Sequence, residues 1–314
     1  MAENRSTQIL NDNRRSPKKF PIVDRFLEGW SVYRENLIGK IGLTLLVIFA
    51  LMALSSFFTP MINPMYHPMT GVDPNISYST GPSWHHWLGT DFIGRDILSQ
   101  LLAGARIAFM VGISAAFMSI LFGTVIGMIA GYSGKIVDTL LMRLADMVMV
   151  MPTLLVVLIL SSLFGQLNIW TIVLLIALFR WPGVSRVIRA QTLSLKERPF
   201  IDAAKVAGAS HFRIIFRHIM PNVLPLSLLY MTFRVTSAII IEAALAFLGF
   251  GDPSAVSWGM MLQWVWKTGN MFQAPYWLLP PGICISLITL SFYMIGRALE
   301  EVLDPRLRKE VAQE

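Results

Sequence analysis

Long apolar stretches separated by shorter polar segments run along this chain, and their lengths predict its fold. A helix that crosses a hydrocarbon layer about 30 Å thick needs about 20 mostly apolar residues, because each residue of helix rises about 1.5 Å. Six runs approach that length and predict an all-α integral membrane protein with six transmembrane helices, at Ile41–Phe58, Ile107–Ala130, Met147–Phe164, Ile169–Val184, Val223–Gly249 and Tyr276–Ile295.

The fourth run is the weakest, because Arg180 and Pro182 interrupt its end. We interpret Arg180 as extending to a membrane interface that Trp181 also marks, since long basic side chains and tryptophans both favour that depth. Without this span, the connections on either side of it would fall on the wrong faces of the membrane.

Composition supports a membrane protein. Hydrophobic residues make up 54% of the chain and charged residues only 14%, whereas a soluble domain carries roughly a quarter charged residues. The single cysteine, Cys284, lies inside an apolar run and excludes both a disulfide framework and a cysteine metal site. The net charge of +7 comes from basic clusters that flank the apolar runs, which indicates contact with lipid and not with nucleic acid.

Charge asymmetry predicts on which side each connection lies. If the amino terminus is cytoplasmic, nearly all of the 26 lysines and arginines fall in cytoplasmic segments, and the outer segments hold only Arg95, Arg106 and Lys267. The positive-inside rule therefore predicts a multi-pass protein of the cytoplasmic membrane with both termini in the cytoplasm. The mostly polar start of the chain is not typical of a cleaved signal.

These patterns divide the chain into consecutive regions. We expect a cytoplasmic tail at 1–36, a first transmembrane helix at 37–59, an external loop at 60–104, a five-helix core at 105–301 that contains a cytoplasmic loop at 185–222, and a second cytoplasmic tail at 302–314. Five prolines predict that the external loop is irregular until Asp96 caps a helix. The outer loop Gly251–Pro275 carries three tryptophans, which we interpret as interface anchors or, alternatively, as contacts for an external partner: Trp258, Trp264 and Trp266.

The cytoplasmic loop predicts two short helices. Pro199 suits a first helical turn, and Asp202 in that turn favours the positive end of the helix dipole. Gly208 then permits a left-handed stop. One face of this first helix carries mostly small side chains at helical spacing: Phe200, Ala203, Ala204 and Ala207. An exposed face of this kind suits docking into a cleft on another protein.

The second short helix is predicted to be amphipathic and to end at Pro221. Arg213 and Arg217 lie on one side of it. The opposite side is apolar: Phe212, Ile215, Phe216 and Ile219.

Several residues inside the spans invite interpretation. Gly123, Gly127 and Gly131 repeat at a spacing that lets two helix backbones pack closely. Arg234 and Glu242 both fall in the fifth span, where an unpaired charge is costly. We favour a structural ion pair within the bundle for these two. The alternative is that one of them lines a translocation path or pairs with a partner subunit.

Two further groups have simple interpretations. His85 and His86 lack a nearby carboxylate or cysteine at ligand spacing, so a plain loop is favoured over a metal site. Asp146 follows Arg143 by three residues, so a local helix pair is expected. No nucleophile and base arrangement indicates an enzyme.

Motifs in the cytoplasmic loop resemble a known family. Asp202-Ala203-Ala204, with Gly208 following and Ile219-Met220-Pro221 at the end, resembles the EAA loop of permease subunits in ABC importers of the bacterial type, although Asp202 stands where a glutamate is usual. Other segments are similar to the second, shorter permease subunit of the dipeptide, oligopeptide and nickel group: Leu88–Asp91, Gly94–Asp96, Gly104–Arg106, Glu242–Gly251 and Leu303–Arg306.

This resemblance implies a fold, partners and a mechanism. The fold would be that of a type I importer permease, with the first short helix as a coupling helix, carried by Phe200, Asp202, Ala203, Ala204, Ala207, Gly208 and Arg213. The implied partners are a second homologous permease subunit, two ATPase subunits and an external substrate-binding protein. ATP and Mg²⁺ would be bound by the ATPase subunits, and this chain has no phosphate-binding loop of its own.

The implied cargo is a dipeptide or an oligopeptide. Oligosaccharides and nickel are the alternatives within the same family. A secondary transporter driven by an ion gradient is the competitor from a different class, and more spans with inverted repeats would be typical of it.

Overall fold

The computed structural model describes residues 30, 33–76, 78–165 and 167–303. The tail 1–36 and the closing motif Leu303–Arg306, both assigned from the sequence, lie almost entirely outside this part of the chain. Helices dominate the described part. Apart from the short 3₁₀ turn Pro64–Tyr66 and the π-helical turn Ile214–Ile219, they are α3 (Leu37–Ser55), α4 (Thr59–Ile62), α5 (Ile97–Ser133), α6 (Lys135–Val150), α7 (Thr153–Phe164), α8 (Ile169–Arg180), α9 (Pro182–Lys196), α10 (Pro199–Val206), α11 (His211–Arg213), α12 (Met220–Phe247), α13 (Trp258–Lys267) and α14 (Pro275–Leu303).

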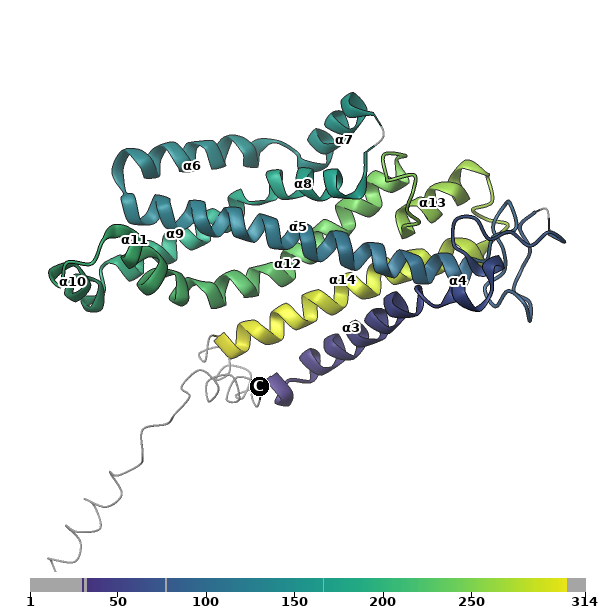
Figure 1. Ribbon diagram of the computed structural model, residues 1–314, viewed down its shortest axis with the longest axis horizontal. Coiled ribbons are helices and arrows are strands. Elements are labelled where there is room, and N and C mark those ends of the chain that lie inside the picture. The colour runs from purple at the N-terminus through teal and green to yellow at the C-terminus, as the bar shows by residue number, and fades with distance from the viewer. Residues whose placement is uncertain (1–29, 31–32, 77, 166, 304–314) are drawn as a thin grey trace, which may run out of the picture.

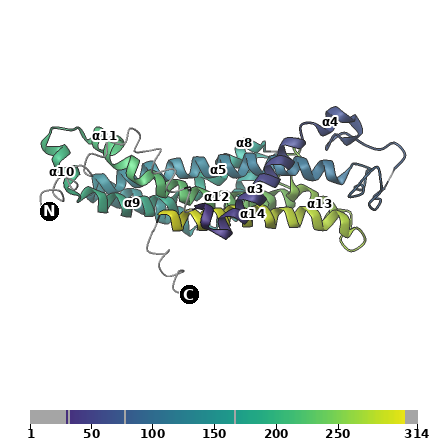
Figure 2. The ribbon, with the colours of Figure 1, turned by 90° about the horizontal axis from the view of Figure 1, so that it is seen from below.

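The long helices run side by side, with α10 and α11 at one end of the molecule and α4 and α13 at the other (Figure 1, Figure 2). Among the described residues, four helical segments are each long and apolar enough to cross a membrane, and two bent helix pairs pass the same test when each pair is taken as one span. The six predicted runs fall on these six segments, which confirms the all-α membrane class.

The third predicted span is not one straight helix. The run Met147–Phe164 crosses the break between α6 and α7, where the axis turns by 81°. Pro152 explains the break, because proline disfavours helical geometry in the residue before it and cannot donate a backbone hydrogen bond. Met151 is accordingly extended, with φ −73° and ψ 124°.

The fourth span is also bent, by 46° between α8 and α9. This bend corrects the interpretation of Arg180 and Trp181. Both lie near the middle of the bent pair, the Trp181 side chain is buried, and the Nε of Arg180 is enclosed by protein without a hydrogen-bond partner. Neither residue marks an interface, because α9 continues the helical path beyond them instead of entering a cytoplasmic loop at residue 185.

The glycine repeat on α5 packs against α9, as its spacing predicted for close helix contact. A Cβ at position 123 would lie 2.7 Å from the Val184 Cβ, and one at position 131 would lie 2.8 Å from the Thr192 Cβ. Hydrogen at these positions lets the two backbones approach closely, which is how helices associate where lipid removes the hydrophobic driving force between them.

The second short helix of the cytoplasmic segment does not end at Pro221. It continues through a π-helical turn at Ile214–Ile219 into α12, so His211–Phe247 forms one helical path. The Met220 N–H donates to the Ile215 carbonyl five residues back, in place of the usual four. This wider turn accommodates the start of α12, where Pro221 needs no N–H partner.

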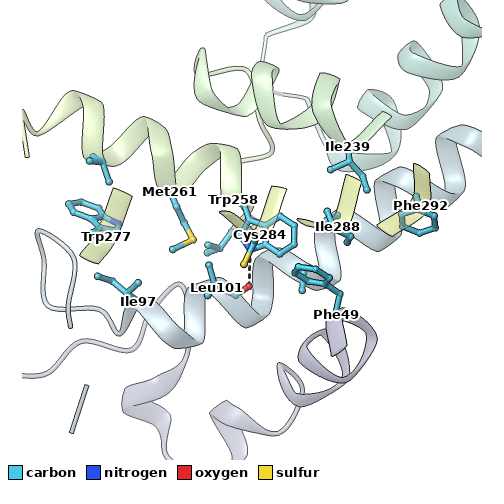
Figure 3. Close-up of a cluster of buried hydrophobic side chains, with 14 of the residues drawn as sticks. Phe49, Ile97, Leu101, Ile239, Trp258, Met261, Trp277, Cys284, Ile288 and Phe292 are labelled. Atoms are coloured by element: carbon cyan, nitrogen blue, oxygen red, sulfur yellow. Dashed lines mark hydrogen bonds between the residues drawn. The ribbon is translucent and has the colours of Figure 1, made fainter. Parts of the chain in front are cut away.

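The half of the bundle that carries α13 is organised by Trp258 (Figure 3). Its indole N–H donates to the Leu101 carbonyl at 2.9 Å, and a Cβ at Gly104 would overlap its ring. The tryptophans of the predicted loop Gly251–Pro275 therefore differ in role, because Trp258 is a core residue on α13 and Trp266 is exposed.

Close packing of α5 on α9 predicts a large cost for bulk at Gly127. Its Cβ would lie 2.6 Å from the Ser185 carbonyl oxygen, so we expect Gly127→Leu to lower the free energy of unfolding by about 1–3 kcal/mol through overpacking. Thermal unfolding of the detergent-solubilised protein measures this. Gly282→Leu on α14 is the control, since no atom lies within 4 Å of the corresponding Cβ. Equal losses in the two variants would contradict close packing at Gly127.

Candidate functional site

The first of the two short helices, α10, projects from one end of the bundle (Figure 1). Its Ile201 side chain is fully buried in a cluster with residues of α5, α9 and α12. Phe200, Ala203 and Ala207 are exposed, and Ala204 is half-buried. The helix is thus held by one apolar side chain while its small-residue face stays open.

Gly208 ends this helix in the predicted left-handed conformation, with φ +77°. Its N–H donates to the Lys205 carbonyl at 3.0 Å, and the Ala209 N–H donates to the Ala204 carbonyl at 3.0 Å. Ser210 then caps the next turn by accepting a hydrogen bond from the Arg213 N–H. Arg213 itself is exposed on this turn. The connection between the two short helices is therefore tightly defined.

Asp202 lies in the first turn of α10 and is exposed. Its carboxylate accepts a hydrogen bond from Lys205 Nζ at 2.9 Å, and this interaction raises the pKa of Lys205 above its ordinary value. Both side chains lie largely in solvent, so the pair contributes little to stability. It leaves a carboxylate and an ammonium group side by side on the projecting helix.

One hydrogen bond attaches this region to α5, and a second joins α5 to α9 at the same residue. The Tyr132 hydroxyl, near the end of α5, hydrogen-bonds with Nδ1 of His211 at 2.8 Å. Lys196 at the end of α9 donates from Nζ to the Tyr132 carbonyl at 2.8 Å. Movement of the projecting segment would therefore displace α5, and α9 with it.

The π-helical turn changes which side of the second short helix is buried. The predicted apolar side was wrong in part, because Phe212 and Phe216 are exposed whereas Ile214 and Ile219 are buried. A five-residue hydrogen-bond repeat rotates side chains relative to an α-helix, and periodicity at 3.6 residues misplaces them. The exposed Phe212 and Phe216 rings lie 4.3 Å apart, centroid to centroid.

The opposite end of the molecule holds a buried polar network. Asp91 is fully buried and accepts hydrogen bonds from Arg95 Nε at 2.6 Å and from Gln100 Nε2 at 2.9 Å. The guanidinium of Arg95 also lies over the Trp264 ring, 4.1 Å from its centroid. Gly94 adopts φ +86°, which lets the backbone fold back around this carboxylate.

His86 is buried between two carboxylates, which the sequence spacing did not indicate. Its Nδ1 lies 2.9 Å from an Asp96 oxygen, and its Nε2 lies 3.3 Å from an Asp73 oxygen. The other Asp96 oxygen accepts from the Ser99 N–H at 2.7 Å and caps α5 as predicted. Asn75 and His86 hold the pKa of Asp73 below its ordinary value. Within the described residues, no group of three or more histidine, cysteine, aspartate or glutamate side chains is arranged to hold a metal ion.

Glu242 is buried on α12, and its carboxyl group interacts with the Ser257 hydroxyl at the start of α13. A Cβ at Gly259 would overlap the Ala243 backbone, so the two helices approach very closely here. Among the described residues no ion pair joins Glu242 to Arg234, and the ion pair favoured from the sequence is therefore wrong.

Asp146 also has a different partner from the one expected. Its carboxylate pairs with Arg186 on α9 and not with Arg143 on its own helix. The fold brings α6 beside α9, which sequence spacing alone does not show.

The open helix α10 lies within a segment that matches a known protein family. The model of the family described as binding-protein-dependent transport system inner membrane component matches residues 123–309, more than half of the chain. This chain belongs to that family. It is thus a multi-pass membrane permease, and the match covers α6 to α14 and the last third of α5.

Curated relatives extend the similarity over almost the full length. The chain is similar to the dipeptide transport system permease protein of Alkalihalophilus pseudofirmus, with 34% identity over 92% of this chain and 93% of that protein. It is also similar to the oligopeptide transport system permease protein of Haemophilus influenzae, with 37% identity over 91% of this chain and 93% of that protein. The corresponding oligopeptide permease protein of Bacillus subtilis is 34% identical over 88% of each chain.

Loss of the buried histidine is predicted to weaken the outer end. His86→Ala removes the hydrogen-bond partner of Asp73 and Asp96 and leaves both carboxylates less well satisfied. We expect the unfolding temperature of the purified protein to fall by several degrees. His85→Ala, at the exposed neighbouring position, is the matched control and should leave it unchanged. Indistinguishable unfolding curves for the two variants would refute the role of His86.

Proposed function

We propose that this permease is one of two transmembrane subunits of an ATP-driven importer of dipeptides or oligopeptides, and that it forms half of the translocation path. The names of the relatives in Alkalihalophilus pseudofirmus and Haemophilus influenzae support the peptide cargo. A second homologous permease subunit, two ATPase subunits and an external substrate-binding protein complete the proposed assembly. ATP and Mg²⁺ bind to the ATPase subunits.

One observation carries this proposal, and it is the open face of α10. Phe200, Ala203 and Ala207 are exposed although Ile201, on the same helix, is fully buried. A helix anchored on one side and covered by no described residue on the other presents a surface of small side chains to a cleft in another protein. We assign that cleft to an ATPase subunit, with Asp202, Ala204, Gly208 and Arg213 as the remaining contributors to the contact.

In the proposed mechanism, ATP binding draws the two ATPase subunits together and moves α10 with them. The contacts of Tyr132 with His211 and Lys196 carry this movement to α5 and α9. The bundle then turns from inward-facing to outward-facing, and substrate arrives from the external binding protein. Hydrolysis resets the system. In this orientation α10 and both termini are cytoplasmic, and the network around Asp91 faces the outside.

A reconstituted system tests the function as a whole. The tagged permease is purified with its partners, placed in proteoliposomes with the loaded binding protein, and assayed for uptake of a radiolabelled dipeptide. We expect uptake to require ATP and to survive an ionophore that collapses ion gradients. Uptake that follows an ion gradient without ATP, with no ATPase subunit in the purified material, would instead establish a secondary transporter.

Bulk on the open face of α10 should block the docking of the ATPase subunit. Ala203→Arg adds a long charged side chain at an exposed position, so we expect normal membrane insertion but greatly reduced co-purification of ATPase subunits. Ser133→Arg, at an exposed position at the end of α5, also adds an arginine but lies outside the open face of α10. This variant should still co-purify with the ATPase subunits. Normal ATPase recovery with Ala203→Arg would rule out this face as the docking surface.

The backbone at Gly208 provides a second test of coupling. A β-branched residue is strongly disfavoured at φ +77°, whereas asparagine tolerates the left-handed region. We expect Gly208→Ile to leave insertion intact but to lower peptide uptake per ATP hydrolysed, and Gly208→Asn to behave nearly as wild type. Both side chains have open space, because no atom lies within 4 Å of the Cβ position. Equal coupling ratios in the two variants would show that this geometry is not needed.

A further inference from the structure

Two arginines lie together where the fourth span bends. Arg180 ends α8, and Arg234 lies midway along α12. A Cβ at Gly183, the second residue of α9, would lie 2.6 Å from Nη2 of Arg234, so the glycine makes room for the guanidinium. The two arginines are close enough for their positive charges to repel each other.

Neither guanidinium has an anionic partner in the described part of the chain. No hydrogen bond or ion pair between described residues involves the side chain of Arg180 or Arg234, and the Nε of Arg180 is enclosed by protein without a partner. Glu242, the acidic residue on the same helix as Arg234, interacts with Ser257 instead. The arrangement therefore concentrates positive charge that the described chain does not neutralise.

The position of Arg234 limits what it can face. The residue is only partly exposed in this chain and lies in the middle of a membrane-spanning segment, His211–Phe247. A cation at that depth is very unfavourable against lipid, and such residues face a bundle interior or a water-filled cavity. Arg234 therefore faces the interior of the assembled transporter.

A groove lies beside this position. Tyr230, one turn before Arg234, lies close enough to interact with it electrostatically. Tyr230 also lines a groove of about 570 Å³ between α9, α12 and α14, which extends past Tyr293 to Arg297. Arg234 thus neighbours a residue that lines a polar and aromatic groove.

We propose that Arg180 and Arg234 together bind the terminal carboxylate of the peptide during translocation. This inference rests on the proposed function. Dipeptides and oligopeptides differ in every side chain but share a carboxylate, and a guanidinium is the side chain best shaped to bind one through two parallel hydrogen bonds. A carboxylate between the two arginines also relieves their mutual repulsion. The site would recognise the feature common to all cargo and leave the choice of peptide to the binding protein.

Transport by the complete reconstituted complex tests this site. Uptake of a dipeptide is compared with uptake of its carboxy-terminal amide, each at a concentration that saturates the binding protein in a separate titration. We expect Arg180→Gln and Arg234→Gln each to lower uptake of the dipeptide by about tenfold or more and to leave uptake of the amide nearly unchanged. Arg234→Lys keeps the charge but cannot form two parallel hydrogen bonds, so its uptake of the dipeptide should lie between that of wild type and that of Arg234→Gln. Arg143→Gln, an exposed position on α6, is the control.

A second measurement needs no binding protein. Phenylglyoxal modifies accessible arginines, and its reaction with Arg234 is followed by mass spectrometry in the nucleotide-free complex. We expect millimolar dipeptide to slow this reaction and the amide to leave it unchanged.

Three outcomes would overturn the proposal. The first is an equal loss of uptake for the dipeptide and its amide. The second is loss of subunit assembly in both Arg234→Gln and Arg234→Lys, which would indicate that Arg234 pairs with the partner permease. The third is a reaction of phenylglyoxal with Arg234 that the dipeptide does not slow. Failure of the wild-type complex to take up any peptide with ATP would contradict the proposed function itself, and that result is distinct from all three.

Discussion

The contact between α5 and α9 is the constraint on which the rest of the structure depends. Helices in a bilayer gain little from hydrophobic burial against each other, so their association relies on close backbone approach. Gly123, Gly127 and Gly131 provide that approach along three turns of α5. Because α9 leads directly into α10, the contact also determines where the open coupling surface lies. The same contact holds the bend after Arg180 against the bundle.

The two ends of the molecule are held by different chemistry. At the end that carries α4 and α13, Asp91 and Asp96 are buried and satisfied by several donors each, which orders a long irregular segment. At the inner end, one buried isoleucine and the hydrogen bond between Tyr132 and His211 hold a short helix. Buried charge networks are rigid because each lost partner is costly. An apolar anchor with one polar contact permits displacement of a whole segment, which suits a part that docks and moves.

Sequence reasoning predicted the elements whose signals are local. The apolar runs, the capping of α5 by Asp96 and the left-handed Gly208 each depend on residues within a few positions of one another, and the structure confirms them. The partners of charged groups depend on tertiary packing. His86, with no acidic residue at ligand spacing in the sequence, contacts Asp73 and Asp96, thirteen and ten positions away. The bend after Met151 had a visible signal in Pro152, but apolar length outweighed it. The π-helical turn had none.

The unbroken helical path from His211 to Phe247 has a mechanical consequence. At about 1.5 Å per residue, 37 residues extend about 55 Å, so this path acts as a single lever arm whose inner tip adjoins α10. The π-helical turn carries the helical path past Pro221 into α12. Tilting at the tip is therefore passed along one helical path, which contains Pro225, to the part of the lever where Arg234 lies.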